Sequence, residues 1–271
     1  MFKINNLTYQ YDKTRKALDN VSMDFNKGDI IGIIGSNGSG KSTLFNNLMG
    51  ILKSTEGEIL YNGEQIKYDK KSLYNLRKEV GIVFQDPEKQ IFYSMVYDDI
   101  AFALRNIGMD EKTIKDRIYT ALEAVNGLQF IDRPVHNLSF GQKKRVAIAS
   151  VVAMENKLVL LDEPTAGLDP ISTRAIVDII KGLNKRGVKI VISSHDMNLI
   201  YEICDYVYVL NQGVLINEGT RAEVFVNEEK INEAGLELPW LVKLHKNMGL
   251  PLFPKEEDLY SFWNKQAQKT V

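Results

Sequence analysis

The sequence predicts an α/β fold with a mostly parallel core sheet, and two apolar segments are the main reason. Residues 29–34 form a short, β-branched run of the kind that makes a buried parallel strand. Residues 157–161 contain four consecutive apolar residues far downstream and also look like a buried strand. Ligands of open parallel sheets lie at the carboxyl ends of the strands. We therefore expect a binding site where these two strands end.

The first run leads directly into a glycine-rich segment, Gly35-Ser36-Asn37-Gly38-Ser39-Gly40-Lys41-Ser42, which Thr43 follows. This spacing is that of a phosphate-binding loop, and residues 41–49 read as a helix that Gly50 ends. The glycines let backbone N–H groups approach phosphates. The helix N-terminus and Lys41 neutralise phosphate charge, and the Ser42 hydroxyl is left for Mg²⁺. The segment predicts a P-loop fold that binds a nucleotide.

The second run ends in two carboxylates, Asp162 and Glu163. At the end of a parallel strand, Asp162 would hold Mg²⁺ through water, and Glu163 would position or deprotonate an attacking water. A charged turn after a strand is the alternative. The phosphate loop upstream favours the catalytic interpretation.

A helix start lies between the two strands, in residues 138–149. Ser139 can cap the helix and Gln142 can complete a capping box. A glycine in the first turn, such as Gly141, lowers the stability of the helix, so the close approach of a ligand would explain its presence. An anion would meet free N–H groups here.

Composition limits the other possibilities. The chain has 271 residues, 44% hydrophobic and 25% charged, with a formal net charge of −1. No global field therefore favours nucleic acid as a partner. No apolar run approaches the length of a membrane span, and the N-terminus lacks the apolar core of a signal peptide. The single cysteine, Cys204, is expected in the core of a cytoplasmic protein.

Six motifs occur in an order that resembles the nucleotide-binding subunit of ABC transporters. They are the phosphate loop, Gln85, residues 138–142, the pair Asp162-Glu163, the segment Ala166-Gly167-Leu168-Asp169, and His195. The usual signature of this family is Leu-Ser-Gly-Gly-Gln, and here Phe140 replaces its first glycine. The resemblance implies a parallel ATP-binding core, an antiparallel β subdomain and a helical subdomain. It also implies that two subunits sandwich two MgATP molecules.

The resemblance assigns the remaining contacts. Tyr11 would stack on adenine, although a strand aromatic that fills core is the alternative. Gln85 would reach Mg²⁺ and sense the membrane partner, and His195 would contact the γ-phosphate. Ser139, Gly141 and Gln142 would complete the site of the neighbouring subunit, and Asp169 would act across the dimer. His136 and His245 match no motif, so we expect surface or packing roles for them.

A finer resemblance is to ATPases of energy-coupling-factor importers, especially the cobalt type. It rests on residues 83–92 and 96–102, and on the segment 234–240. It implies integral membrane partners (a coupling subunit and a substrate-capture subunit), a homodimer or a heterodimer with a paralogous ATPase, and a peripheral place on the cytoplasmic face of the membrane. Four aromatic residues would line a groove for a partner helix or, equally, fill subdomain core: Phe92, Tyr93, Tyr97 and Phe102.

The expected organisation follows from the patterns along the chain. Residues 1–28 and 57–66 alternate apolar and polar around a hairpin turn at 61–64, and residues 86–153 read as largely helical. Within them, Ile114, Ile118, Leu122 and Val125 form one apolar stripe. We expect an ATP-binding domain over 1–220 and a C-terminal helical extension over 221–271.

Several functions share a phosphate loop, and the other motifs separate them. A chromosome-type ATPase would need a long coiled coil, a translation-type protein two ATPase domains, and a scaffold would lack Glu163 or His195. A soluble P-loop kinase stays as the weaker alternative. We expect an ATPase that drives import of a small solute. Cobalt is the first expectation, and nickel or a vitamin is the alternative.

Overall fold

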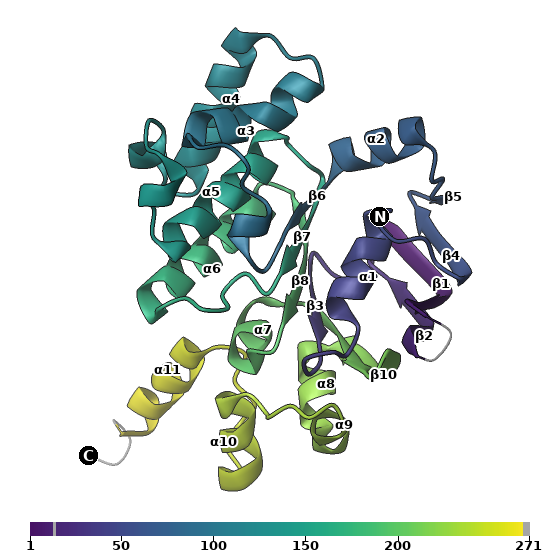
Figure 1. The fold of residues 1–271 in the computed structure, drawn as a ribbon. Coiled ribbons are helices and arrows are strands. Elements are labelled where there is room, and N and C mark those ends of the chain that lie inside the picture. Colours follow the sequence, from purple (N-terminus) through teal and green to yellow (C-terminus); the bar gives the residue numbers. More distant parts are fainter. Residues whose placement is uncertain (13–14, 268–271) are drawn as a thin grey trace.

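The computed structural model describes residues 1–12 and 15–267, which contain two β-sheets and their covering helices (Figure 1). The larger sheet has six strands in the order β10-β9-β3-β8-β7-β6. All neighbours from β9 to β6 are parallel, and β10 joins β9 antiparallel at the edge. The mostly parallel core sheet is thus confirmed. Its strands are β3 (Ile30–Ile34), β6 (Val80–Val83), β7 (Leu158–Asp162), β8 (Lys189–Ser194), β9 (Tyr206–Asn211) and β10 (Val214–Thr220).

The smaller sheet is antiparallel, with strand order β2-β1-β4-β5. Its strands are β1 (Phe2–Gln10), β2 (Lys16–Asp24), β4 (Glu56–Tyr61) and β5 (Glu64–Gln65). Asn62 and Gly63 connect the last two with φ angles of 52° and 85°. Positive φ at both central residues is what a two-residue hairpin requires, so the predicted turn is confirmed.

Helices cover the larger sheet and extend beyond it. In Figure 1, α3, α4 and α5 form a group on the opposite side of the molecule from the antiparallel sheet, and the C-terminal helices lie below the larger sheet. The helices are α1 (Lys41–Leu48), α2 (Lys70–Glu79), α3 (Val96–Asn106), α4 (Glu111–Ala124), α5 (Phe140–Ala153), α6 (Pro170–Lys185), α7 (Met197–Ile203), α8 (Arg221–Val226), α9 (Glu228–Glu233), α10 (Trp240–Met248) and α11 (Glu256–Ala267). Short 3₁₀ turns are η1 (Pro87–Lys89), η2 (Leu128–Phe130) and η3 (Val135–Asn137).

Both faces of the larger sheet are buried, which explains why its strands are continuous apolar runs. On β3, Ile31 and Ile33 pack into one core cluster with α1 and the antiparallel sheet. Ile30 and Ile34 point into the second cluster, with α5, α6 and α7. The site at the strand ends is therefore held by two cores.

The predicted apolar stripe between residues 112 and 127 lies on α4 and on Val125, the residue that caps the C-terminus of this helix. Its four residues are fully buried, as Ile114, Ile118, Leu122 and Val125 all have 0% exposure. Cys204 is also buried, and burial raises the pKa of its thiol. These side chains serve packing, as the sequence predicted.

The segment after residue 220 contributes apolar side chains to the main core. Val224, Phe225 and Ile231 are fully buried in the cluster that contains α5 and α6. The Tyr201 hydroxyl donates to the Phe253 carbonyl at 3.1 Å, which ties this segment to α7. The domain boundary at residue 220 stays a prediction. The last four residues of the expected C-terminal extension, 268–271, lie outside the described residues. Within the described ranges, we find no helix with the length and apolarity of a membrane span.

Candidate functional site

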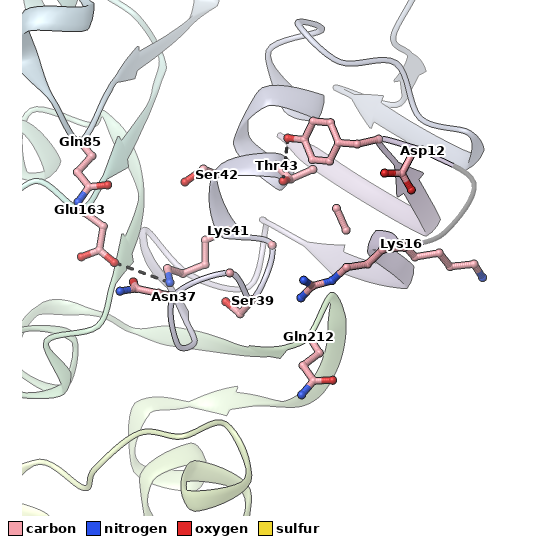
Figure 2. Close-up of a pocket in the computed structure, with 15 residues that line it drawn as sticks. Asp12, Lys16, Asn37, Ser39, Lys41, Ser42, Thr43, Gln85, Glu163 and Gln212 are labelled. Atoms are coloured by element: carbon pink, nitrogen blue, oxygen red, sulfur yellow. Dashed lines mark hydrogen bonds and ion pairs between the residues drawn. The ribbon is translucent and has the colours of Figure 1, made fainter.

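A cavity of about 460 Å³ lies at the phosphate loop, beside the antiparallel sheet (Figure 2). Residues from the antiparallel sheet and from the loops after β3, β6, β7 and β9 surround it. They are Tyr11, Asp12, Arg15, Lys16, Ala17, Asn37, Gly38, Ser39, Gly40, Lys41, Ser42, Thr43, Gln85, Glu163 and Gln212. The structure therefore brings together most of the predicted pocket residues, which lie far apart in the sequence.

The phosphate loop has the backbone that its glycines allow. Gly40 caps α1 with φ 107°, and a Cβ at this position would lie 2.7 Å from the Ala17 carbonyl oxygen. Only glycine fits there without displacing β2. The Ser39 hydroxyl is buried at the cavity and has no hydrogen-bond partner among the described residues. A buried polar atom of this kind fits an oxygen-rich ligand such as a phosphate group.

Lys41 is buried at the start of α1 and is held by the loop itself. Its Nζ donates to the carbonyls of Gly35 at 2.7 Å and Ser36 at 3.1 Å. The same Nζ lies 3.8 Å from Glu163 Oε1, the ion pair dashed in Figure 2. Burial lowers the pKa of Lys41, and the Glu163 carboxylate opposes that shift. The ammonium is thus positioned to neutralise an anion in the cavity.

Glu163 is buried at the carboxyl end of β7 in an unusual backbone conformation. Its φ is 46°, in the left-handed region that non-glycine residues seldom adopt. Its N–H donates to the carbonyl and the hydroxyl of Ser193, both at 3.1 Å. The carboxylate Oε2 lies 2.8 Å from Nδ1 of His195, so its two oxygens face Lys41 and His195. Strained residues of this kind cluster at functional sites.

The residues predicted to hold a metal carry oxygen donors only. Ser42 and Gln85 are exposed to the cavity, and the Asp162 carboxylate is buried and accepts from the Ser193 hydroxyl at 2.5 Å. Among the described residues, no group of three or more His, Cys, Asp or Glu side chains is placed to hold a metal. One carboxylate with hydroxyl and amide oxygens suits Mg²⁺, which relies on water and substrate phosphates for its other ligands.

Tyr11 lies at the rim of the cavity with 63% of its surface exposed. Its hydroxyl is 3.2 Å from Thr43 Oγ1, and its ring stands edge-on to Tyr9 with centroids 5.0 Å apart. A ring this exposed does not fill core, so one face is available to a flat ligand.

The predicted signature residues lie outside this cavity. Ser139 caps α5, its hydroxyl accepting from the Gln142 N–H at 3.3 Å while the Gln142 side chain accepts from the Ser139 N–H at 2.9 Å. The capping box is confirmed. Because the Ser139 hydroxyl acts there as an acceptor, its own proton remains available for a ligand.

The structure gives a reason for glycine at position 141 that the sequence did not reveal. A Cβ on Gly141 would lie 3.0 Å from the Ser172 hydroxyl. Ser172 in turn donates from its N–H and its hydroxyl to the carboxylate of Asp169, which caps α6. The start of α5 therefore packs closely against the start of α6. The structure joins the signature to Asp169 and leaves both apart from the phosphate loop.

The segment after Gln85 is fastened to the helical part of the chain. Gln90 accepts from the Phe84 N–H at 3.1 Å and donates to the Ala147 carbonyl at 3.1 Å. Lys143 pairs with Glu88 at 2.5 Å, which also joins this segment to α5. Movement of α5 would therefore carry the Gln85 segment with it.

The four aromatic residues divide between surface and core. Phe92 is 77% exposed, and Tyr93 and Phe102 are also exposed. The ring centroids of Tyr93 and Phe102 lie 5.5 Å apart. Tyr97 is partly buried against the main core. A groove of about 370 Å³ adjoins the exposed group, lined by Glu88, Ile91, Phe92, Tyr93, Ser94, Val135, His136 and Lys143. His136 is thus a surface residue, whereas His245 Nδ1 lies 2.6 Å from the Leu250 carbonyl in a local contact.

Sequence reasoning missed several residues near the site. Arg15, Lys16 and Gln212 line the cavity, and Lys144 contacts the Glu163 carbonyl. The first two follow Tyr11 closely, which was an available signal. Gln212 and Lys144 reach the site only through the tertiary fold.

Comparison with known proteins agrees with this geometry. The family model described as ABC transporter matches residues 18–166. The cobalt import ATP-binding protein CbiO of Salmonella typhimurium is 45% identical over 267 residues, 98% of this chain and 98% of that protein. The energy-coupling factor transporter ATP-binding protein EcfA of Methanocaldococcus jannaschii is 45% identical over 238 residues, 88% of this chain and 85% of that protein.

A solved structure has the same fold. It is that of cbiO1 from Clostridium perfringens, described as part of the ABC transporter complex cbiONQ. It is 41% identical, covers 90% of this chain and 98% of that one, and superposes with a TM-score of 0.78. These similarities extend over almost the whole described chain. The chain therefore belongs to the ABC transporter family and is one of its ATP-binding subunits, the ATPases that are coupled to transport.

Proposed function

We propose that two copies of this subunit, or one copy and a paralogue, enclose MgATP between them and hydrolyse it to drive import of cobalt ion through separate membrane subunits. The observation that carries the ATPase mechanism is the position of Glu163. Its carboxylate lies at the phosphate loop between Lys41 and His195, at 3.8 and 2.8 Å. The cargo rests on the cobalt importer names of the relatives.

The residues of the cavity divide the work of hydrolysis. Lys41 and the loop N–H groups bind the phosphates, Tyr11 covers the base, and Glu163 orients and deprotonates the attacking water. His195 steadies the Glu163 carboxylate and reaches toward the γ-phosphate. Mg²⁺, held by Ser42, Gln85 and Asp162, supplies neutralising charge on the phosphates when bound. The reaction needs mainly positioning and charge stabilisation.

The second copy supplies what the cavity lacks. Ser139, Gly141 and Gln142 stand at a helix start that is suited to phosphate but absent from the lining of their own chain's cavity. Across a dimer they would meet the phosphates bound by the partner, and Asp169 would lie beside them. Closure would then require nucleotide in the site.

Closure reaches the membrane subunits through the Gln85 segment. The exposed residues Phe92, Tyr93 and Phe102 adjoin a groove that the segment helps to form. An apolar helix of the coupling subunit fits such a surface. The chain would thus be held at the cytoplasmic face of the membrane by its partners. The transported ion would not touch this chain.

The cargo and the partner are tested together. Co-expressed with its membrane subunits and reconstituted in vesicles, the complex should take up Co²⁺ only with ATP. Uptake of Ni²⁺ or of a vitamin in place of Co²⁺ would assign the alternative cargo. The isolated chain should bind no bare lipid vesicles, and such binding would contradict a peripheral role through partners. The kinase alternative is set aside by the family membership.

A further inference from the structure

Lys144 is the one lysine of α5 that is completely removed from solvent, with 0% exposure. Its Nζ donates to the backbone carbonyl of Glu163 at 2.9 Å. An ammonium group is costly to bury unless it is paired or hydrogen-bonded. Here the carboxylates of Asp162, Glu163 and Asp86 oppose that cost, but burial dominates and lowers the pKa of Lys144 to about 8.

The carbonyl that Lys144 contacts belongs to the strained residue of the site. Glu163 has φ 46°, and Ser193 on β8 fixes its N–H side with two contacts at 3.1 Å. Lys144 fixes its carbonyl side from α5. The backbone of Glu163 is therefore held on both sides, by two different elements. An unusual backbone conformation persists only where its surroundings determine it in this way.

Core packing alone does not account for this lysine. A methionine would fill nearly the same volume without a buried charge. Lys144 does not line the nucleotide cavity, so it does not serve as a direct phosphate ligand in its own chain. The ammonium adds two contacts at this position, the hydrogen bond to the Glu163 carbonyl and a position over the Phe140 ring, 6.0 Å from its centroid. Of the two, the hydrogen bond is the one that reaches the proposed base.

We propose that Lys144 is a positioning residue for hydrolysis, which holds the Glu163 backbone so that its carboxylate faces the reacting water. The proposal rests on the proposed role of Glu163. Lys144 lies within the first two turns of the helix that begins with Ser139 and Gln142. It therefore joins the signature helix to the catalytic carboxylate within one chain. A rotation of α5 during closure would therefore move the backbone of Glu163 through this hydrogen bond.

The test measures ATP hydrolysis and nucleotide binding by the purified transporter complex that carries Lys144→Met. Turnover should fall about 10–100-fold, the usual cost of a misplaced catalytic group. KM and the affinity for a fluorescent ATP analogue should stay within about threefold, because the binding residues are untouched. Lys112→Met is the matched control, an exposed lysine on α4, and should keep wild-type turnover.

Combining Lys144→Met with Glu163→Gln shows whether Lys144 acts through Glu163. In Glu163→Gln, where the base is already absent, adding Lys144→Met should lower the residual turnover by less than about twofold. The same 10–100-fold loss in both backgrounds would overturn the proposal, and so would wild-type turnover in Lys144→Met alone.

A third variant keeps the test valid if Lys144→Met does not fold. Lys144→Gln retains an N–H donor but is one bond too short, so we expect a smaller turnover defect that disappears in the Glu163→Gln background. Unchanged turnover in a Lys144→Gln complex would then contradict the proposal. The proposed function fails separately, either because Glu163→Gln hydrolyses ATP normally or because the wild-type complex imports no Co²⁺.

Discussion

The phosphate-loop cavity and the start of α5 are both suited to phosphate, yet they differ in what surrounds them. Around the cavity, Lys41 and His195 each contact Glu163, and the core holds the site from two sides. At the start of α5, Ser139 and Gln142 bond to each other through the capping box, and Ser139 is exposed. The groups of the first region, the phosphate-loop region, are therefore held by contacts within the chain. In the second, the signature region, the exposed Ser139 hydroxyl keeps a proton that it can donate.

The contact between Lys144 and Glu163 joins these regions, although their ligand-facing groups remain apart. Gly141 packs instead against Ser172, which ties the start of α5 to the start of α6 and not to the cavity. In the proposed dimer, the Lys144 contact would link closure at the start of α5 to Glu163 of the same chain. Substitutions that alter one region at a time can separate their contributions.

The strongest effect is expected from Glu163→Gln, which alters the phosphate-loop region. The amide keeps the shape and one hydrogen-bonding oxygen but cannot accept a proton from water. Turnover should therefore fall about 10²–10⁴-fold, while nucleotide affinity is kept. Steady-state hydrolysis and equilibrium binding of MgATP measure the two quantities. Turnover within a few-fold of wild type would remove Glu163 from the role of base.

An effect of intermediate size is expected of pH on the free energy of unfolding. It comes from Lys144, the lysine that contacts Glu163 from α5. Burial lowers the pKa of Lys144 from its ordinary value of 10.5 to about 8, so the unfolded chain binds more protons than the folded one between these values. Below about pH 8 the lysine is charged in both states, so the buried charge destabilises the folded state in full. As the pH rises toward 10.5, the folded state has released this proton and the destabilisation disappears.

Lys144→Met removes this titration and gives the reference. The free energy of unfolding of the wild type, measured relative to Lys144→Met, should rise by about 2 kcal/mol between about pH 7.5 and about pH 9.5. Denaturant unfolding at the two pH values measures the change. A pH-independent difference would show that the folded protein binds this proton with ordinary affinity.

The weakest effect is expected from Tyr11, at the rim of the phosphate-loop region. Its exposed ring offers one face to a base, and a ring contact of this kind contributes about 0.5–1.5 kcal/mol. Tyr11→Ala should weaken ATP binding by about 2–10-fold, whereas Tyr11→Phe should not. Binding titrations with ATP and with inorganic triphosphate separate the base from the phosphates. An equal loss for both ligands would argue against stacking.

Local patterns in the sequence were sufficient for the phosphate loop and for the pair Asp162-Glu163, but not for other residues that line the cavity, such as Arg15 and Gln212. The phosphate loop predicted the end of β3 and the start of α1, because strand, glycine loop and helix follow one another within a few bonds. The capping box at Ser139 and Gln142 was likewise visible, since both partners lie in one turn. The hairpin at Asn62 and Gly63 follows the same rule.

Contacts between distant segments were not visible in the sequence. Lys144 meets a residue that is 19 positions away and on another element, and Gly141 meets Ser172 across two helix starts. No periodicity signals such pairs, because they depend on how α5 and α6 sit on the sheet. Helix α2 was missed for a different reason: Leu76 is its only buried residue, so it lacks an apolar stripe.

Whether the start of α5 completes the site of a second copy is tested most directly by hydrolysis and nucleotide binding in the Ser139→Arg protein, assembled in its complex. The matched control is Thr120→Arg, which places the same side chain on the exposed surface of α4. We expect Ser139→Arg to bind ATP like the control but to hydrolyse it at least about 100-fold more slowly, because the arginine blocks closure on the partner's phosphate. Wild-type hydrolysis in Ser139→Arg would contradict a shared site, because Ser139 would then be an ordinary helix cap.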